Sequence, residues 1–292
     1  MLVIDCGSGG TRICRKTKKG VERLKWPKGS APVLSNVLPS DERRRDFASD
    51  INALAAPCLI GATAGLRYAL LTGTVSEADI EALRELLPEN CTFQILSPLE
   101  EAQLELASLL FNIPDAVTMI SMGGKSMQIG CEANLFSLPF AMHLGYGMLK
   151  KSRNGPWRER VAAAAHEYEA KCDEAAENDR IALLDGTIWG VTDTVDVAIS
   201  LKIVNRSPMP VGNLIEALDA CATYYTESDP LVLDCDDMTL LARVLALRTV
   251  AKRLKPSCAI SFRSDFGVTW AEGYLHGTPR PLSRPPREPS FC

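Results

Sequence analysis

The chain has 292 residues, 46% of them hydrophobic, and a formal net charge of −4. This length fits one large domain or two of about 100–200 residues each, and the slightly acidic balance gives no reason to expect a nucleic-acid partner. No apolar run approaches the roughly 20 residues that a membrane span needs, so we expect no membrane partner either.

The first predicted element is a short strand that begins at residue 2, so we expect no signal peptide. The 10 cysteines stand singly along the chain and form no Cys-x-x-Cys pair. We therefore expect free thiols in a reducing compartment, and with them a cytoplasmic location.

A glycine-rich turn follows this strand in the sequence LVIDCGSGGTR (2–12). Three apolar residues lead to Asp5, and the three glycines behind it allow the backbone to approach a ligand closely. Backbone N–H groups in such a turn can bind a phosphate, and a carboxylate beside them can hold a hydrated cation. An ordinary turn between two strands is the alternative interpretation.

The pattern up to residue 115 predicts alternating helices and strands. Ser76 and Ser97 are good N-cap residues, and two acids follow Pro98 at the positive end of a helix dipole. The predicted elements are a hairpin that turns at 18–20, a helix over 41–56, a buried strand from 58 that becomes a helix after Gly65, a helix over 76–87, a strand over 91–96 and a helix over 97–113.

The segment AVTMISMGGKSMQIGCE (116–132) repeats the opening pattern of apolar strand, glycine turn and second strand. Two such hairpins, about 115 residues apart, are typical of related lobes that face each other across a phosphate site. The repeat predicts a first lobe over 1–115 and a second lobe over 116–267.

We expect the last predicted helix to pack back on the first lobe, and the Pro- and Arg-rich residues 278–292 to form a flexible tail. His143, His166 and His276 lie far apart in sequence, which favours structural or surface positions over a metal site. The elements predicted here are helices over 158–179, 212–225 and 237–254, the third capped by Asp236 or Asp237, a strand over 257–264 and a helix over 268–277.

Five stretches follow the order of the apyrase-conserved regions of the nucleoside triphosphate diphosphohydrolase family: DCGSGGTR (5–12), GATAGLR (61–67), SPLEEA (97–102), MGGKSMQIG (122–130) and VTWAEGYLHG (268–277). The chain resembles this apyrase family from end to end, although residues 152–210 match none of its regions. The resemblance implies an α/β fold of the actin, heat-shock ATPase and sugar-kinase superfamily, with a nucleotide cleft between two ribonuclease-H-like lobes. It also implies Mg²⁺ or Ca²⁺ as cofactor and nucleoside tri- or diphosphates as partners.

The resemblance also assigns roles to individual residues. Asp5 would support the hydrated cation, and Thr63 and Arg67 would face or brace the cleft. Glu101 would be the base that activates water, with Glu100 as the alternative, and Ser126 and Gln128 would hold the same water. If both acids only complement the helix dipole, neither is the base. The implied phosphate-binding residues are Gly7, Ser8, Gly9, Gly10, Thr11, Arg12, Thr63, Gly123, Gly124 and Lys125.

Three positions depart from the family pattern: a glycine replaces the usual second serine or threonine of the first region, Pro98 replaces the glycine of the third region, and Ser121 stands in the fourth region. Active apyrases carry an aspartate before the glycines of the fourth region, where this chain has Ser121, so we expect a metal site with one acidic anchor instead of two. Three functions stay open: cation-dependent hydrolysis of the terminal phosphate of nucleoside tri- or diphosphates, nucleotide binding with weak or no hydrolysis, and exopolyphosphatase-like hydrolysis. Tyr146 is a candidate for the cleft, while base preference and oligomeric state are not indicated.

Overall fold

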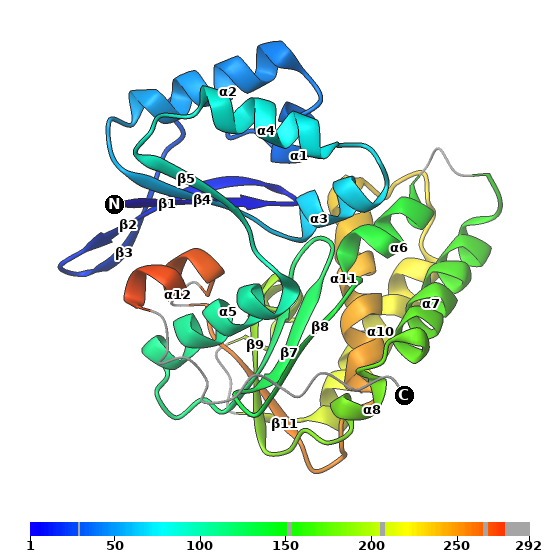
Figure 1. Cartoon of the computed structure of the whole chain (residues 1–292). Coiled ribbons are helices and arrows are strands. Elements are labelled where there is room, and N and C mark those ends of the chain that lie inside the picture. The colour runs from blue at the N-terminus through cyan, green and yellow to red at the C-terminus, as the bar shows by residue number, and fades with distance from the viewer. Residues whose placement is uncertain (29, 151–153, 205–207, 265–267, 278–292) are drawn as a thin grey trace, which may run out of the picture.

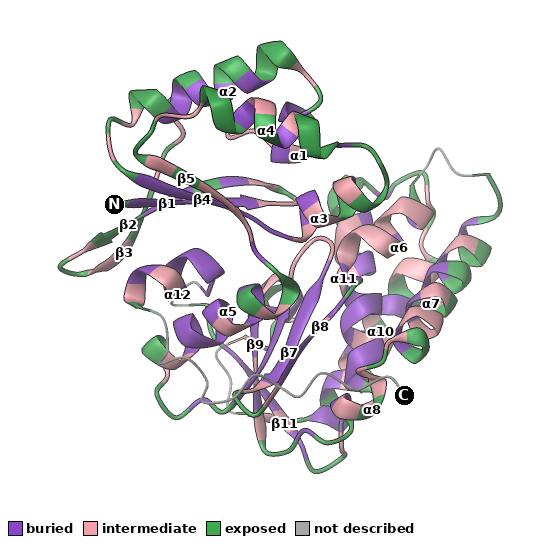
Figure 2. Cartoon of the chain, viewed as in Figure 1, coloured by how far each residue is buried: buried purple, intermediate pink, exposed green. Residues whose placement is uncertain are grey.

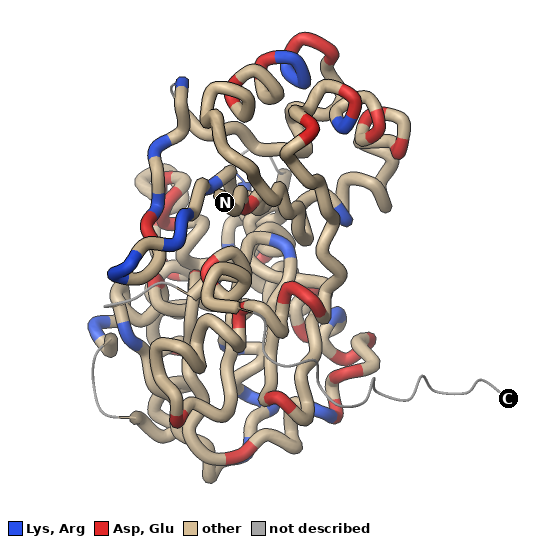
Figure 3. The backbone as a smooth tube through the Cα atoms, turned by 60° about the vertical axis from the view of Figure 1, so that its left-hand side comes forward, with Lys and Arg blue, Asp and Glu red and all other residues tan. Residues whose placement is uncertain are grey.

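The computed structural model describes residues 1–277 except 29, 151–153, 205–207 and 265–267. The predicted tail over 278–292 therefore lies outside the described residues. Among the helices of the described part, none has both the length and the apolar character of a bilayer-spanning segment. Lys and Arg positions and Asp and Glu positions are both spread along the backbone (Figure 3), which fits the small net charge.

The first half of the chain forms a five-stranded sheet with the strand order β3-β2-β1-β4-β5 (Figure 1). Strands β1 to β3 are antiparallel neighbours, whereas β4 and β5 continue the sheet parallel to β1. Every residue of β4 is buried, as expected for a parallel strand that is covered on both faces. The strands are β1 (Leu2–Gly7), β2 (Gly10–Thr17), β3 (Gly20–Leu24), β4 (Cys58–Ala62) and β5 (Cys91–Ile95).

Helices cover one face of this sheet (Figure 1). Ile4 and Ile60 of the sheet share a hydrophobic cluster with Phe47 and Ile80 of these helices. The predicted N-cap at Ser76 is confirmed, because its hydroxyl and the Asp79 carboxylate form a reciprocal capping box. The covering helices are α1 (Leu34–Val37), α2 (Asp41–Ala53) and α4 (Glu77–Leu86), and α3 (Ala64–Leu71) follows β4 directly.

The second half repeats this connectivity in a sheet with the order β10-β11-β9-β6-β7-β8. Strands β6 to β8 are antiparallel neighbours, and β9 and β11 continue the sheet parallel to β6. The division at residue 115 stays a prediction, but both halves have the connectivity of a ribonuclease-H-like lobe. The strands are β6 (Thr118–Met122), β7 (Met127–Cys131), β8 (Asn134–Leu138), β9 (Thr187–Thr192), β10 (Met209–Pro210) and β11 (Ala259–Phe262).

The largest hydrophobic cluster lies between the second sheet and the helices on one of its faces, and it includes Ile120, Ile129 and Phe262. Helix α11 is largely enclosed there (Figure 2). Its N-cap is Asp234 and not Asp236 or Asp237 as predicted, because the Asp234 carboxylate accepts hydrogen bonds from both of their backbone N–H groups. The helices are α6 (Met142–Leu149), α7 (Trp157–Glu174), α8 (Asn178–Ile181), α9 (Asp193–Ser200), α10 (Val211–Glu227) and α11 (Cys235–Ala251).

Helices α5 (Pro98–Asn112) and α12 (Trp270–His276) cross between the two halves. Helix α5 follows the first sheet but packs on β6, β7 and β8, and α12 follows the second sheet but packs on β1 and β2. The two helices also pack on each other, so closely that a Cβ on Gly273 would lie 1.8 Å from the carbonyl oxygen of Leu104. Each half therefore supplies a helix that covers the sheet of the other.

Gly273→Ala tests this crossing. The added methyl group collides with the backbone of α5, so we expect the free energy of unfolding to fall by about 1–3 kcal/mol, the usual cost of overpacking. Gly212→Ala is the matched control, because a Cβ there meets nothing within 4 Å. Urea denaturation measures both, and equal stability of the two variants would contradict the close approach of α5 and α12.

Candidate active site

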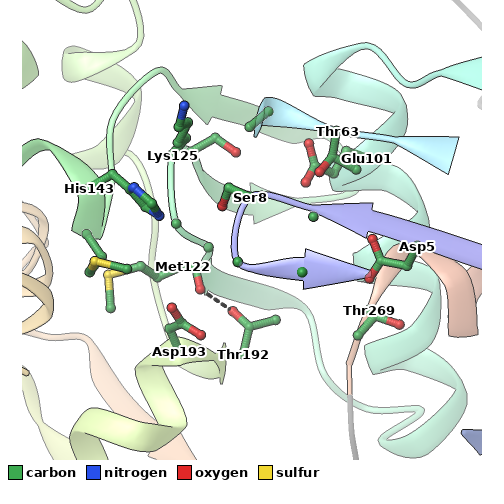
Figure 4. A pocket seen from close by; sticks show the side chains of 18 of the residues that line it. Asp5, Ser8, Thr63, Glu101, Met122, Lys125, His143, Thr192, Asp193 and Thr269 are labelled. Atoms are coloured by element: carbon green, nitrogen blue, oxygen red, sulfur yellow. Dashed lines mark hydrogen bonds between the residues drawn. The ribbon is translucent and has the colours of Figure 1, made fainter. Parts of the chain in front are cut away.

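A cavity of about 450 Å³ opens between the two glycine hairpins (Figure 4). Each of the five motif regions contributes at least one residue to its lining; the last region contributes Thr269. Two of the predicted catalytic residues, Glu100 and Gln128, are not in its lining, and neither is Arg67. The predicted residues that line it are Asp5, Gly7, Ser8, Gly9, Gly10, Thr11, Arg12, Thr63, Glu101, Gly123, Gly124, Lys125 and Ser126.

The two glycine hairpins touch each other. A Cβ on Gly124 would lie 2.1 Å from Oγ of Ser8 and 2.7 Å from the ring of His143. Gly65, in the first turn of α3, approaches from another side, where a Cβ would lie 2.9 Å from Cα of Ser8. Because Gly124 has no side chain of its own, the second hairpin comes this close to Ser8, and backbone N–H groups of both hairpins can face one anion.

Asp5 has only 4% of its surface exposed and lies at the inner edge of the cavity. Its Oδ1 accepts a hydrogen bond of 2.6 Å from Nε1 of Trp270, and Nη1 of Arg12 lies 3.4 Å from its Oδ2. Burial raises the pKa of Asp5, while Arg12 and Trp270 oppose the rise. The Trp270 ring packs against Gly61, where a Cβ would lie 2.3 Å from it. Helix α12 thus holds this carboxylate in place.

Glu101 lies in the first turn of α5 with 7% of its surface exposed. Its Oε2 accepts a hydrogen bond of 2.8 Å from Nη2 of Arg67, which also donates to the carbonyl of Leu96. Burial raises the pKa of Glu101 to about 7; Arg67 opposes this rise and Asp5 adds to it. A carboxylate with this pKa can accept a proton near neutral pH, as a general base must.

No protein-family model matches the chain, and no curated protein matches its sequence. Several solved structures share its fold over nearly the whole chain, at low sequence identity. The Aquifex aeolicus PPX-GPPA enzyme is 14% identical, with 94% of this chain and 97% of that chain covered and a TM-score of 0.56. The type II variant of the A. aeolicus Ppx/GppA phosphatase is also 14% identical, with 95% and 98% covered and a TM-score of 0.58. The chain has the actin-like ATPase fold.

The predicted fold class is therefore confirmed. A further structure of the A. aeolicus Ppx/GppA family member agrees, at 13% identity, 94% and 95% coverage and a TM-score of 0.59. The likeness shows the fold alone and does not single out the apyrase family. In the actin-like ATPase fold of this chain, the cavity lies beyond the carboxyl ends of β1, β4, β6 and β9, where open α/β sheets bind ligands.

Two residues predicted to be catalytic form hydrogen bonds with other protein groups instead of lining the cavity. Glu100 is exposed, and its carboxylate accepts from the backbone N–H of Ser97 while the Ser97 hydroxyl accepts from that of Glu100. This capping box matches the alternative interpretation of that acid as part of the helix N-terminus. Gln128 is 1% exposed, and its Nε2 donates a hydrogen bond of 2.8 Å to Oγ of Ser126. Gln128 is placed to orient Ser126.

Thr11 and Lys125, both predicted to bind phosphate, also have partners within the protein. Oγ1 of Thr11 donates a hydrogen bond to the carbonyl of Pro32, and Nζ of Lys125 lies 4.0 Å from the ring centroid of Tyr68. A cation above an aromatic ring contributes only about 0.5–1 kcal/mol at exposed sites. Lys125 can therefore leave this ring for a phosphate more readily than Thr11 can leave its carbonyl.

The cavity also receives residues that the sequence analysis did not identify. Glu105 follows Glu101 by one turn of α5, and this spacing of four on one helix face was the signal that could have found it. His143 lines the cavity, although the sequence favours a structural or surface position for it, and burial lowers its pKa. The other unpredicted residues of the lining are Ala31, Ala64, Met122, Met142, Thr192, Asp193, Arg243 and Thr269.

Trp270→Phe removes the N–H that donates to Asp5, together with the outer ring atoms that contact Gly61. We expect the free energy of unfolding to fall by about 1–3 kcal/mol, the cost of leaving a buried acceptor without its donor. Trp189→Phe, in β9, controls for the smaller ring at a partly buried position. In urea titrations, a Trp270→Phe variant as stable as this control would show that the hydrogen bond adds nothing.

Proposed function

We propose that this protein hydrolyses the terminal phosphoanhydride bond of nucleoside tri- or diphosphates with a divalent cation. The observation that carries the proposal is Glu101, a buried carboxylate with its pKa raised to about 7, in the lining that both glycine hairpins share. A site that only bound phosphate would gain nothing from this carboxylate, because it repels an anion. A carboxylate in this position is useful if it acts as the general base that deprotonates the attacking water.

The chemistry follows from the positions of these groups. Backbone N–H groups of both hairpins bind phosphate oxygens. Glu101 accepts a proton from a water molecule as the water oxygen attacks the terminal phosphorus, and the bond from phosphorus to the bridging oxygen breaks. The shortened phosphate chain leaves with that oxygen. Arg67 holds the Glu101 carboxylate through its 2.8 Å ion pair, and Ser126, oriented by Gln128, holds the same water.

The residues also fit a hydrated divalent cation. Asp5 and Glu105 line the cavity, and Oε2 of Glu105 is buried without a hydrogen-bond partner. Such carboxylate oxygens are the donors that Mg²⁺ and Ca²⁺ prefer. Across the described residues, no group of three His, Cys, Asp or Glu side chains is arranged to hold a metal ion, so the protein would hold this cation largely through its waters. When bound, it neutralises charge on the phosphate oxygens.

Exopolyphosphatase-like hydrolysis is the second candidate, and the cavity lining favours it. Among the described residues of that lining, His143 carries the only aromatic ring, and Tyr146 is not part of it. Phe, Tyr and Trp side chains are the usual stacking platforms for bases. A substrate that consists of phosphates alone needs no such platform. The fold shared with the Ppx/GppA phosphatases supports a phosphohydrolase in either case.

Phosphate release from ATP, ADP and long-chain polyphosphate, each with Mg²⁺ or Ca²⁺, separates these candidates. Release from the nucleotides supports the proposal, and release from polyphosphate alone selects the second candidate. Thermal stabilisation by nucleotide without any release would identify a nucleotide-binding protein that does not hydrolyse its ligand.

Glu101→Gln should lower kcat by roughly 10²-fold or more and change the affinity for substrate little, as expected when a general base is lost. Steady-state kinetics on the best of the three substrates provide the measurement. Full activity in Glu101→Gln together with a large loss in Glu100→Gln would move the role of base to Glu100.

The pH profile offers a second test of the same group. Glu101 must be ionised to accept a proton, so kcat/KM should decline as the pH drops below about 7. Arg67 opposes the rise of this pKa, and Arg67→Gln should therefore move the acidic limb of the profile to higher pH. If the limb stays at the same pH in the variant, the titrating group is not Glu101.

A further inference from the structure

The two glycine hairpins occupy equivalent positions in their sheets, but only one carries an acid. Asp5 of β1 stands opposite Arg12 of β2, and Ser121 of β6 stands opposite Gln128 of β7. Asp5 and Ser121 each come two residues before the first glycine of their turn. Ser121 is completely buried. The second hairpin therefore lacks the carboxylate that the first one has.

A carboxylate from another element lies beside Ser121. Glu105 of α5 lines the cavity, and burial raises its pKa while the neighbouring Ser121 side chain opposes this rise. Only 7% of its surface is exposed, and its Oε2 is buried without a hydrogen-bond partner. Burying an ionised carboxylate oxygen in this way is strongly unfavourable unless a proton, a positive charge or a hydrogen-bond donor meets it.

We propose that Glu105 supplies the acidic group that Ser121 lacks, and that Glu105 and Asp5 hold a hydrated divalent cation at the phosphate chain. This inference rests on the proposed function, because it concerns the cation of the same site. Helix α5 crosses from the first sheet onto the second, and this crossing lets one helix bring Glu101 and Glu105 to the cavity.

Glu105 has a carboxylate oxygen without a protein partner, whereas Asp5 has none. Both Asp5 oxygens already interact with protein groups, Oδ1 with Trp270 and Oδ2 with Arg12. Oε2 of Glu105 has no such partner. A water molecule on Mg²⁺, which dehydrates reluctantly, is a strong donor of matching charge. Of the two carboxylates, Glu105 should therefore matter more for cation binding.

The test measures Mg²⁺ binding directly. Mg²⁺ is titrated by calorimetry into the full chain with saturating imidodiphosphate, a phosphoanhydride analogue that is not hydrolysed. Glu105→Gln should weaken Mg²⁺ binding by about 10-fold or more, since the amide keeps the shape but loses the charge. The apparent melting temperature without ligand should stay the same or rise, because a buried charge is removed. Glu85→Gln, an exposed position of α4, is the matched control and should bind Mg²⁺ as the parent chain does.

A relocated carboxylate gives a second, stricter test. The double variant Ser121→Asp with Glu105→Gln moves the carboxylate from α5 to the strand β6, where it faces the new amide on α5. It should restore Mg²⁺ binding to within about threefold of the parent chain. Ser121→Asp alone puts two carboxylates in contact and should lower the melting temperature without Mg²⁺. Restoration in the double variant is a result that a merely structural Glu105 would not produce.

The outcomes separate this inference from the proposed function. Unchanged Mg²⁺ affinity in Glu105→Gln, or no recovery in a folded double variant, overturns the role of Glu105 even if the parent chain hydrolyses nucleotides. Loss and recovery of Mg²⁺ binding support that role even if the parent chain releases no phosphate from any substrate.

Discussion

The close crossing of α5 and α12 is the constraint on which the candidate site depends. Gly273 allows α12 to approach the backbone of Leu104, and no residue with a Cβ fits there without a shift. Because each helix packs on the sheet of the other half, α5 brings Glu101 and Glu105 to the cavity while α12 sets Trp270 against Asp5. Packing between the halves thus brings the acids of α5 to the glycine hairpins and gives Asp5 its donor.

The second feature of the site is electrostatic. Asp5, Glu101 and Glu105 are all buried, and burial raises the pKa of each. Arg67 and Arg12 compensate two of them through ion pairs. Groups that are unfavourable to bury and whose pKa values are shifted gather at functional sites more often than elsewhere, because the chemistry needs them there. The hydrophobic clusters of both sheets offset this local cost.

Short-range signals predicted a large part of this arrangement. The alternation of apolar residues, the glycine turns and the capping residues Ser76 and Ser97 act within a few residues, and the elements formed largely as expected. The repeated hairpin indicated two related lobes, and the structure has two sheets that share the same connectivity around these hairpins. Glu105 and His143 were not predicted, because their place in the cavity depends on what packs against them; for Glu105 the only sequence signal is its spacing of four from Glu101. Glu100 carried a motif signal and is a helix cap.

The sequence by itself determined the two glycine hairpins, the order of helices and strands around them and the acids at the start of α5, since backbone conformation and hydrogen bonding over a few residues decide these features. Only the tertiary structure decided which acids face the cavity. The exchange of α5 and α12 between the halves turns Glu101 and Glu105 inward, leaves Glu100 in solvent and gives Asp5 a donor from the far end of the chain. Burial and contacts over more than 200 residues of separation, as between Asp5 and Trp270, follow from packing and not from any local pattern.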